Sequence, residues 1–247
     1  MLETVVCENE ESLCRRVGDY IHDVLKSKTA AGAKVSVGVS GGSMPSQICP
    51  SLRGFQDVRW DLIHFFYCDE RLVPLTHKDS THRLYEDLLY SKINIPRDNI
   101  HIVDTSLPAN VAAGDYADKM FSFFSPSDGF PCFDLLLLGI GPDGHTCSLF
   151  PDHALLHVTD VCVAPIMDSP KPPPQRVTLT LPVLNKAKRV VFIASGIGKS
   201  EVIHHILTSP PTSLLPCSLV QPVDGELVWY LDKEAASKVP PTVLKQH

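Results

Sequence analysis

The 247-residue sequence lacks the features that would assign it to a membrane or to a nucleic acid. Its longest apolar stretches are far shorter than the ~20 residues needed to cross a bilayer, and no basic segment leads into an apolar one near the N-terminus. A net charge of -6 and a pI near 6.0 provide no positive field that would attract a polyanion. We therefore expect a soluble, cytoplasmic protein that binds neither nucleic acid nor membrane. An anionic ligand must then be held by a local cluster of cations.

The sequence also lacks the cysteine spacing of a zinc site or of a disulfide framework. Its eight cysteines are scattered, form no CxxC pair and lie mostly within apolar stretches such as Val161–Val163. This distribution is typical of reduced thiols packed in a core. We expect no structural metal.

Segments with the pattern of buried strands alternate with segments of helical period. Continuous apolar runs, typical of strands buried on both faces of a parallel sheet, occur at Trp60–Tyr67, Leu135–Leu138 and Arg189–Ser195. Helical spacing of apolar residues is present over Glu10–Lys28 and Val111–Phe124. This alternation predicts an α/β protein with an open, mainly parallel sheet and helices on both faces.

Shorter strands complete the predicted sheet. They are expected at Val35–Val39, Ile100–Val103, Val161–Ile166, Arg176–Leu181 and Glu226–Leu231. The alternation in Arg176–Leu181 indicates a strand buried on one face only. Because a chain of this length can form one α/β domain, we expect residues 1–247 to be a single domain.

An aspartate and a histidine follow the most apolar of these strands. The sequence LLLLGIGPDGHTCSLFP, residues 135–151, places Asp143 and His145 in a glycine-containing turn directly after the four leucines. Open α/β sheets bind ligands at the carboxyl ends of their strands, where diverging loops leave a crevice. The alternative is a turn aspartate followed by a helix-capping segment. We favour a chemical role, because a solvated histidine at this position has no packing function.

A second candidate site follows the strand Val35–Val39. Glycines allow the backbone to approach a ligand, and free N–H groups at the start of a helix can bind an anion. The turn therefore suits a phosphate, although it is neither a P-loop nor a GxGxxG motif, and an ordinary strand-to-helix connection is the alternative. Its residues are Ser40, Gly41, Gly42 and Ser43, followed by Met44 and Pro45.

Charged residues end two further strands. Asp69, Glu70 and Arg71 follow Trp60–Tyr67 and could contribute to a site or form a solvated turn with an internal ion pair. Lys199 lies in the first turn of a helix after Arg189–Ser195, where the helix dipole disfavours a cation unless an anionic ligand compensates. The stiff proline-rich segment 169–175 is interpreted as a connector that presents Arg176.

Together these segments resemble the 6-phosphogluconolactonases, within the wider family that includes glucosamine-6-phosphate deaminase. The shared motifs are SGGSxP at 40–45, DERxVPxxHxxS at 69–80, GxGPDGHTxSLFP at 139–151, PPPQRxTLTxPxLNxA at 172–187 and GxxK at 196–199. The resemblance implies a Rossmann-like, NagB-type fold. It also implies hydrolysis of 6-phospho-D-glucono-1,5-lactone to 6-phosphogluconate in the pentose phosphate pathway, without metal or organic cofactor. Met44 and Thr81 stand where the family often has threonine and asparagine, so no side-chain role is carried over to them.

The residues suggest roles in such a reaction. His145, with an ordinary pKa of about 6.5, is the expected base. Either Asp143 or Asp69 could orient its imidazole, and the sequence does not choose between them. Cys147 is an alternative nucleophile, although a small thiol at this position is ordinarily a packing residue. The substrate phosphate is expected to meet Ser40, Gly41, Gly42, Ser43, Lys199 and one or both of Arg71 and Arg176.

Two other functions fit the same motifs. The sister deaminases carry an additional glutamate shortly after the histidine, whereas residues 146–151 contain no acid. A catalytically silent sugar-phosphate sensor would keep the phosphate site without needing His145. The histidine therefore favours the lactonase.

Overall fold

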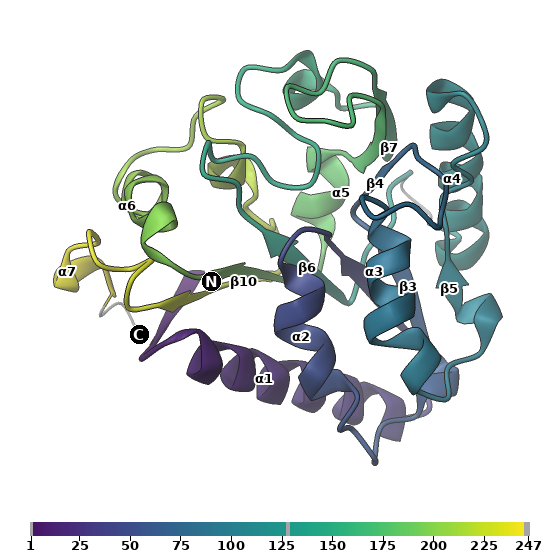
Figure 1. Cartoon of the computed structure of the whole chain (residues 1–247), viewed down its shortest axis with the longest axis horizontal. Coiled ribbons are helices and arrows are strands. Elements are labelled where there is room, and N and C mark those ends of the chain that lie inside the picture. Colours follow the sequence, from purple (N-terminus) through teal and green to yellow (C-terminus); the bar gives the residue numbers. More distant parts are fainter. Residues whose placement is uncertain (1, 127–128, 245–247) are drawn as a thin grey trace.

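Within residues 2–126 and 129–244, which the computed structural model describes, seven parallel strands form the central sheet (Figure 1). Every neighbouring pair in this sheet is parallel, so the strand carboxyl ends meet at one edge. In spatial order the strands are β1 (Leu2–Cys7), β10 (Glu226–Asp232), β9 (Arg189–Ala194), β6 (Leu135–Gly139), β2 (Val35–Val39), β3 (Ile63–Tyr67) and β5 (Ile100–His101).

Helices cover both faces of this sheet, and the strands supply apolar residues to each side. In β6, Leu135 and Leu137 pack on one face and Leu136 and Leu138 on the other, with all four fully buried. The first face is covered by α1 (Glu10–Ala30), α2 (Met44–Leu52) and α3 (Thr81–Leu88), and the second by α4 (Ala109–Phe124), α5 (Leu181–Lys186) and α6 (Ser200–Thr208). A short α7 (Pro241–Leu244) contacts β1. The predicted fold class, an α/β fold with a mainly parallel sheet and helices on both faces, is confirmed. The domain extent of 1–247 stays a prediction.

A second, antiparallel sheet of three strands packs beside the first. It consists of β4 (Asp69–Arg71), β8 (Arg176–Leu179) and β7 (Val163–Ile166), with β8 in the middle. The sequence predicted a strand buried on one face at Arg176–Leu181, and this was wrong. All four residues of β8 are buried, because the strand is central in its sheet and packs against α4.

Several strand boundaries differ from the predicted ones, and the strand predicted at Val161–Ile166 begins at Val163. Residues Trp60–Leu62 form a 3-10 turn, and the strand begins only at Ile63. The strand predicted at Ile100–Val103 is limited to Ile100–His101, because only these two residues pair with β3. The edge strand β1 was not predicted, since it pairs only with β10 and its short sequence mixes polar and apolar residues.

The strand order creates a crevice between β2 and β6. From β2 the chain moves to β3 and β5 on one side of the sheet, and it then returns to β6, β9 and β10 on the other side. Connections after β2 and β6 therefore run in opposite directions. Ligands in open α/β sheets bind at such a reversal, so the topology positions a site at the ends of these two strands.

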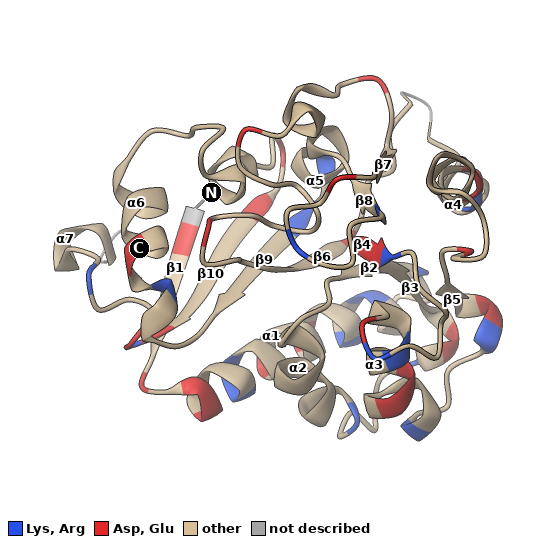
Figure 2. Cartoon of the chain, turned by 45° about the horizontal axis from the view of Figure 1, so that its top comes forward, with Lys and Arg blue, Asp and Glu red and all other residues tan. Residues whose placement is uncertain are grey.

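Charges of both signs are interspersed over the outer helices (Figure 2). Ion pairs such as Arg83–Asp87 on α3 and Arg97–Glu86 link neighbouring groups.

No helix in the described part of the chain is long and apolar enough to span a bilayer. All eight cysteines lie within that part, and none forms a disulfide. Six of them are buried, as expected for cysteines packed in a core.

Two adjacent histidines in the core make the stability of this fold dependent on pH. Nδ1 of His64 lies 3.1 Å from Nε2 of His101, and both rings pack against Phe123. Burial lowers the pKa of His64 to about 4, and burial together with His64 lowers that of His101 to about 4. The folded state therefore holds both imidazoles neutral over a range in which the unfolded chain protonates them.

We predict that the free energy of unfolding decreases as the pH falls from about 6.5 to about 4. Each histidine contributes at most about 1.4 kcal/mol per pH unit, because the unfolded chain binds the extra proton. Urea unfolding of the double variant His64→Gln/His101→Gln should show a shallower dependence over this range. The exposed His205→Gln should keep the wild-type slope. Equal slopes in all three proteins would contradict the assignment.

Candidate active site

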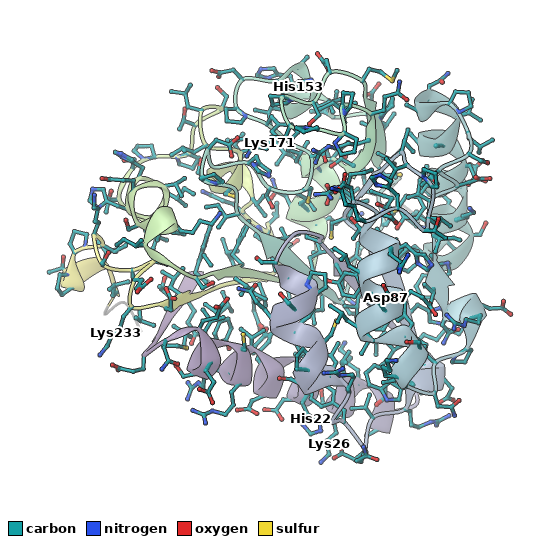
Figure 3. All side chains as sticks on the ribbon, in the orientation of Figure 1. His22, Lys26, Asp87, His153, Lys171 and Lys233 are labelled. Carbon is teal, nitrogen blue, oxygen red and sulfur yellow. The ribbon has the colours of Figure 1, made fainter. Side chains whose placement is uncertain are left out.

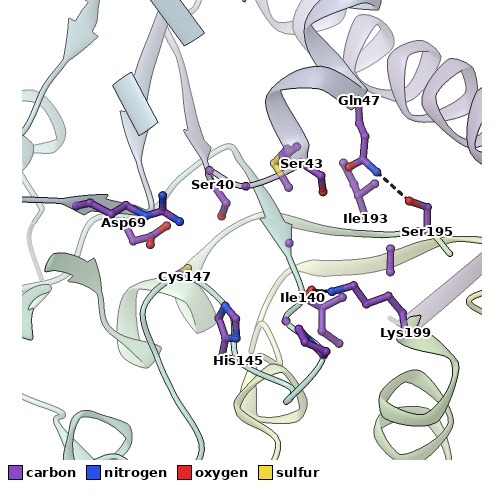
Figure 4. Close-up of a pocket in the computed structure, with 18 residues that line it drawn as sticks. Ser40, Ser43, Gln47, Asp69, Ile140, His145, Cys147, Ile193, Ser195 and Lys199 are labelled. Carbon is purple, nitrogen blue, oxygen red and sulfur yellow. Dashed lines mark hydrogen bonds between the residues drawn. The ribbon is translucent and has the colours of Figure 1, made fainter. Parts of the chain in front are cut away.

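A cavity of about 230 Å³ lies at the carboxyl ends of β9, β6, β2 and β3 (Figure 4). Four segments that are far apart in the sequence line it: residues 40–44 with Gln47, Asp69 with Arg71, 139–142 with His145 and Cys147, and 193–195 with Lys199. The parallel sheet brings these segments together because all their strands end at the same edge. The cavity contains most of the residues that the sequence suggested.

The turn after β2 forms one wall of the cavity. Gly42 has a φ of +70°, a conformation that side chains disfavour, and an added Cβ on Gly41 would lie 2.8 Å from Oγ1 of Thr81. Ser43 precedes α2 and makes no side-chain capping bond, and Pro45 occupies the first turn of that helix. The predicted strand, glycine turn and helix are confirmed, and Ser40, Gly41, Gly42 and Ser43 all line the cavity.

The turn after β6 holds the aspartate–histidine pair. Nδ1 of His145 lies 2.5 Å from Oδ1 of Asp143, and the imidazole packs at 4.9 Å from the Phe150 ring. His145 lines the cavity, whereas Asp143 lies behind it. Asp69 instead accepts a hydrogen bond from Oγ of Ser148 at 2.8 Å. Of the two acids that the sequence left open, Asp143 is therefore the one that contacts the imidazole.

The backbone of this turn depends on a close approach at Gly141. Its N–H donates to the carbonyl of His145 at 2.8 Å, which closes the turn. An added Cβ on Gly141 would lie 1.9 Å from Nδ1 of His145 and 2.5 Å from Oδ1 of Asp143. Cys217 donates its N–H to the carbonyl of Gly144 at 3.0 Å and supports the turn from the other side. Only glycine at position 141 leaves room for this pair.

The environment sets the protonation of the pair. Burial lowers the pKa of His145 below its ordinary value, although the hydrogen bond with Asp143 opposes the shift. Burial favours the neutral carboxyl of Asp143, but hydrogen bonds from His145 and Lys171 outweigh it and lower the pKa of Asp143 to about 2. At neutral pH the pair is therefore a carboxylate next to a neutral imidazole.

Two of the predicted cations reach the cavity. Arg71 lines it and donates Nη1 to the carbonyl of Asp79 at 2.9 Å, while its buried Nε has no hydrogen-bond partner among the described residues. Lys199 ends a 3-10 turn directly before α6 and donates Nζ to the carbonyl of Ile140 at 2.6 Å. Burial lowers the pKa of Lys199 from its ordinary value.

Arg176 pairs with Arg71 across the antiparallel strands β8 and β4. It is 3% exposed and does not line the cavity. Its guanidinium donates to the carbonyls of Lys171, Pro172 and Pro173 at 2.8, 3.2 and 3.0 Å. In this arrangement Arg176 fixes the proline-rich segment, so a contact between Arg176 and phosphate stays a prediction that the geometry does not favour.

The three charged residues after β3 are divided between two functions. Because they form the strand β4, Asp69 and Arg71 point into the cavity, whereas Glu70 points away. Glu70 is fully buried and accepts hydrogen bonds from the N–H groups of Thr81 and His82 at the start of α3. The alternative of a solvated turn with an internal ion pair was wrong, because Glu70 caps a helix instead.

Cys147 and Lys171 both differ from what the sequence suggested. Cys147 lines the cavity, but the ring of His145 bonds to Asp143, lies 3.0 Å from Nζ of Lys171 and makes no hydrogen bond to this thiol. The alternative of a histidine-activated cysteine therefore has no geometric support.

Lys171 was not predicted as a site residue, since it lies 26 positions after His145 and only the folded segment 169–175 brings it close. No group of three or more histidine, cysteine or acidic side chains in the described residues could hold a metal.

A sequence profile of the family described as glucosamine-6-phosphate isomerases/6-phosphogluconolactonase matches residues 8–229. The chain belongs to this family. The glucosamine-6-phosphate isomerase/6-phosphogluconolactonase family includes human 6-phosphogluconolactonase, which is 49% identical over 213 residues that cover 83% of this chain and 81% of the human protein. A probable 6-phosphogluconolactonase 1 of Arabidopsis thaliana is 38% identical over 250 residues, which cover 96% of this chain and 93% of that protein.

Solved structures of the same family superpose on nearly the whole chain. The 6-phosphogluconolactonase of Thermotoga maritima gives a TM-score of 0.81 at 31% identity, covering 94% of this chain and 100% of that one. The Leishmania guyanensis 6-phosphogluconolactonase gives 0.86 at 25% identity, with 97% and 99% covered. A monomeric glucosamine-6-phosphate deaminase gives 0.77 at 18% identity and shares the fold, with 96% and 99% covered. The NagB-type architecture is thus confirmed.

We predict that Gly141→Ala breaks the hydrogen bond between His145 and Asp143, because the added methyl group occupies the position of the imidazole. The short Nδ1–H bond should give a low-field proton NMR signal in the wild type, assigned by its loss in His145→Asn. The signal should disappear in Gly141→Ala. It should persist in Gly114→Ala, whose Cβ meets nothing within 4 Å. An unchanged signal in folded Gly141→Ala would show that the turn tolerates a side chain.

Proposed function

We propose that this protein hydrolyses 6-phospho-D-glucono-1,5-lactone to 6-phospho-D-gluconate in the pentose phosphate pathway, with His145 as the general base. The observation that carries the proposal is the His145–Asp143 pair, 2.5 Å apart, at the edge of a cavity that also holds the glycine turn and two cations. The names of the relatives that match most of the chain support the same reaction.

The pair can activate water without further groups. A lactone is an activated ester, so the protein has to orient a water molecule, accept its proton and return a proton to the leaving ring oxygen. Asp143 binds Nδ1 of His145, which leaves Nε2 as the proton acceptor. The neutral imidazole that burial favours is the form that a base requires. Proton transfer in both directions can therefore use one side chain.

In this proposal the phosphate binds to the glycine turn before α2 and to two cations in the cavity wall. The backbone of Gly41 and Gly42 and the hydroxyl of Ser43 are at the start of α2, where an anion is favoured. Lys199 and Arg71 add charge-assisted hydrogen bonds. A phosphate fixed there orients the lactone carbonyl toward His145.

A coupled assay tests the proposed activity directly. Fresh 6-phosphogluconolactone, produced in place by glucose-6-phosphate dehydrogenase, is supplied to the protein, and 6-phosphogluconate is followed through its own dehydrogenase. The protein should accelerate product formation above spontaneous hydrolysis. Ammonia release from glucosamine 6-phosphate would instead indicate a deaminase. Tight binding of 6-phosphogluconate without acceleration would indicate a sensor.

We predict that His145→Asn lowers kcat by roughly 10²- to 10⁴-fold, since asparagine keeps a polar side chain but cannot accept and return a proton. Affinity for 6-phosphogluconate and the circular dichroism spectrum should change little. The lactone's own decay is subtracted at every pH. A folded variant that retained more than about a tenth of the wild-type kcat would require another base.

We predict that Lys199→Ala weakens substrate capture by about 1.5 to 3 kcal/mol, measured as a loss in kcat/KM, because one charge-assisted phosphate contact is removed. Gluconolactone without a phosphate should be a poor substrate for the wild type and almost insensitive to this change. Lys26→Ala, on α1, serves as the control for loss of one positive charge. Equal proportional losses on both lactones would show that Lys199 does not bind phosphate.

A further inference from the structure

Lys171 contacts the aspartate–histidine pair from outside the cavity. Its Nζ lies 3.0 Å from Oδ1 of Asp143 and 3.0 Å from Nδ1 of His145. Neither Lys171 nor Asp143 lines the cavity, whereas His145 does. A ligand in the cavity therefore meets the imidazole, and Lys171 is linked to the cavity lining through the pair.

The backbone of Lys171 is held in place by its surroundings. Its carbonyl accepts hydrogen bonds from the buried Arg176 at 2.8 Å and from Oγ of Ser169 at 2.8 Å, and its N–H donates to the same Ser169 hydroxyl at 3.2 Å. Arg176 also binds the carbonyls of the next two prolines. Folding thus orders the backbone, and only the lysine side chain loses further freedom when it reaches Asp143.

The short contact between Asp143 and His145 fixes the position of the proton. Two lone pairs 2.5 Å apart would repel each other, so a proton lies between Nδ1 and Oδ1. Asp143 is ionised at neutral pH, so the proton belongs to Nδ1 of the imidazole. Nδ1 then has no lone pair for Lys171, which donates to Oδ1 instead. The imidazole keeps its free lone pair on Nε2.

We propose that Lys171 is a positioning residue that shares Oδ1 of Asp143 with His145 and keeps the imidazole neutral as a base. A proton added at Nε2 would create a second positive charge close to the ammonium group of Lys171. Asp143 by itself would favour that proton. The lysine opposes it and still keeps the carboxylate oriented. For catalysis the inference rests on the proposed function, but the effect on His145 is a property of the free protein.

Other groups around His145 also affect its charge. Burial has the largest effect and disfavours the imidazolium, Asp143 and Asp69 favour it, and Lys171 disfavours it. The charged or titratable groups that face the imidazole or line the same cavity are Asp143, Cys147, Asp69, Arg71, Lys171, Lys199 and Cys217. Only Asp143 and Lys171 among them lie within 3.0 Å of a ring nitrogen, so a change at Lys171 should be visible in the titration of His145.

The deciding experiment is an NMR titration of His145 in the free protein, with the signal assigned by its loss in His145→Asn. In Lys171→Met the pKa of His145 should rise by about half to one unit, as expected for removal of a nearby charge at a partly exposed position. Lys171→Arg, which keeps the charge, should stay near the wild type. Lys26→Met removes one positive charge from the opposite side of the molecule and should leave the pKa unchanged (Figure 3).

The kinetic counterpart is the acid side of the kcat/KM profile for the lactone. In Lys171→Met it should move to higher pH by the same amount as the His145 titration. A purely structural role would lower activity equally at every pH and leave the profile in place. An unchanged His145 titration in folded Lys171→Met would overturn the inference. If the titration shifts but the wild type hydrolyses no lactone, the proposed function fails while the inference about the pair holds.

Discussion

The absence of a side chain at Gly141 is the constraint on which the site depends. The Nδ1 atom of His145 occupies the space where a Cβ of residue 141 would lie, 1.9 Å away, and Oδ1 of Asp143 is 2.5 Å from the same point. The N–H of Gly141 simultaneously closes the turn on the carbonyl of His145. One small residue therefore sets both the backbone shape and the contact between the two side chains. An imidazole held in this way has a defined proton position without any metal ligand.

The parallel sheet supplies the remaining geometry. Because the strand order reverses between β2 and β6, the SGGS turn and the aspartate–histidine turn leave the sheet in opposite directions and form a crevice. The small antiparallel sheet adds to it, since alternation along β4 points Asp69 and Arg71 inward and lets Glu70 cap α3. The same sheet carries Arg176, which holds Lys171 behind the pair. The cavity thus combines the glycine turn and two cations with an imidazole whose pKa is lowered by burial.

The sequence predicted the fold class, and most of the site residues that it suggested line the cavity, because the signals were local. Four leucines buried on both faces, a glycine turn and the GPDGHT segment each carry their structure within a few neighbours. It could not identify β1, whose pairing with β10 depends on a partner more than two hundred residues away. It also predicted a strand buried on one face at Arg176–Leu181, because the alternation of side chains does not reveal a second sheet packed against α4.

The sequence alone identified the two residues of the pair, since Asp143 and His145 lie two positions apart in one turn. Which acid orients the imidazole was decided only by tertiary structure, because Asp69 and Asp143 end different strands and their side-chain directions depend on the sheet. The same holds for Arg176 and Lys171, of which the sequence suggested only Arg176 as a site residue. The sequence marked the arginine as a ligand for phosphate. Folding buries its guanidinium against three loop carbonyls and brings the lysine to the histidine, because the unpaired carbonyls of a proline-rich loop need donors.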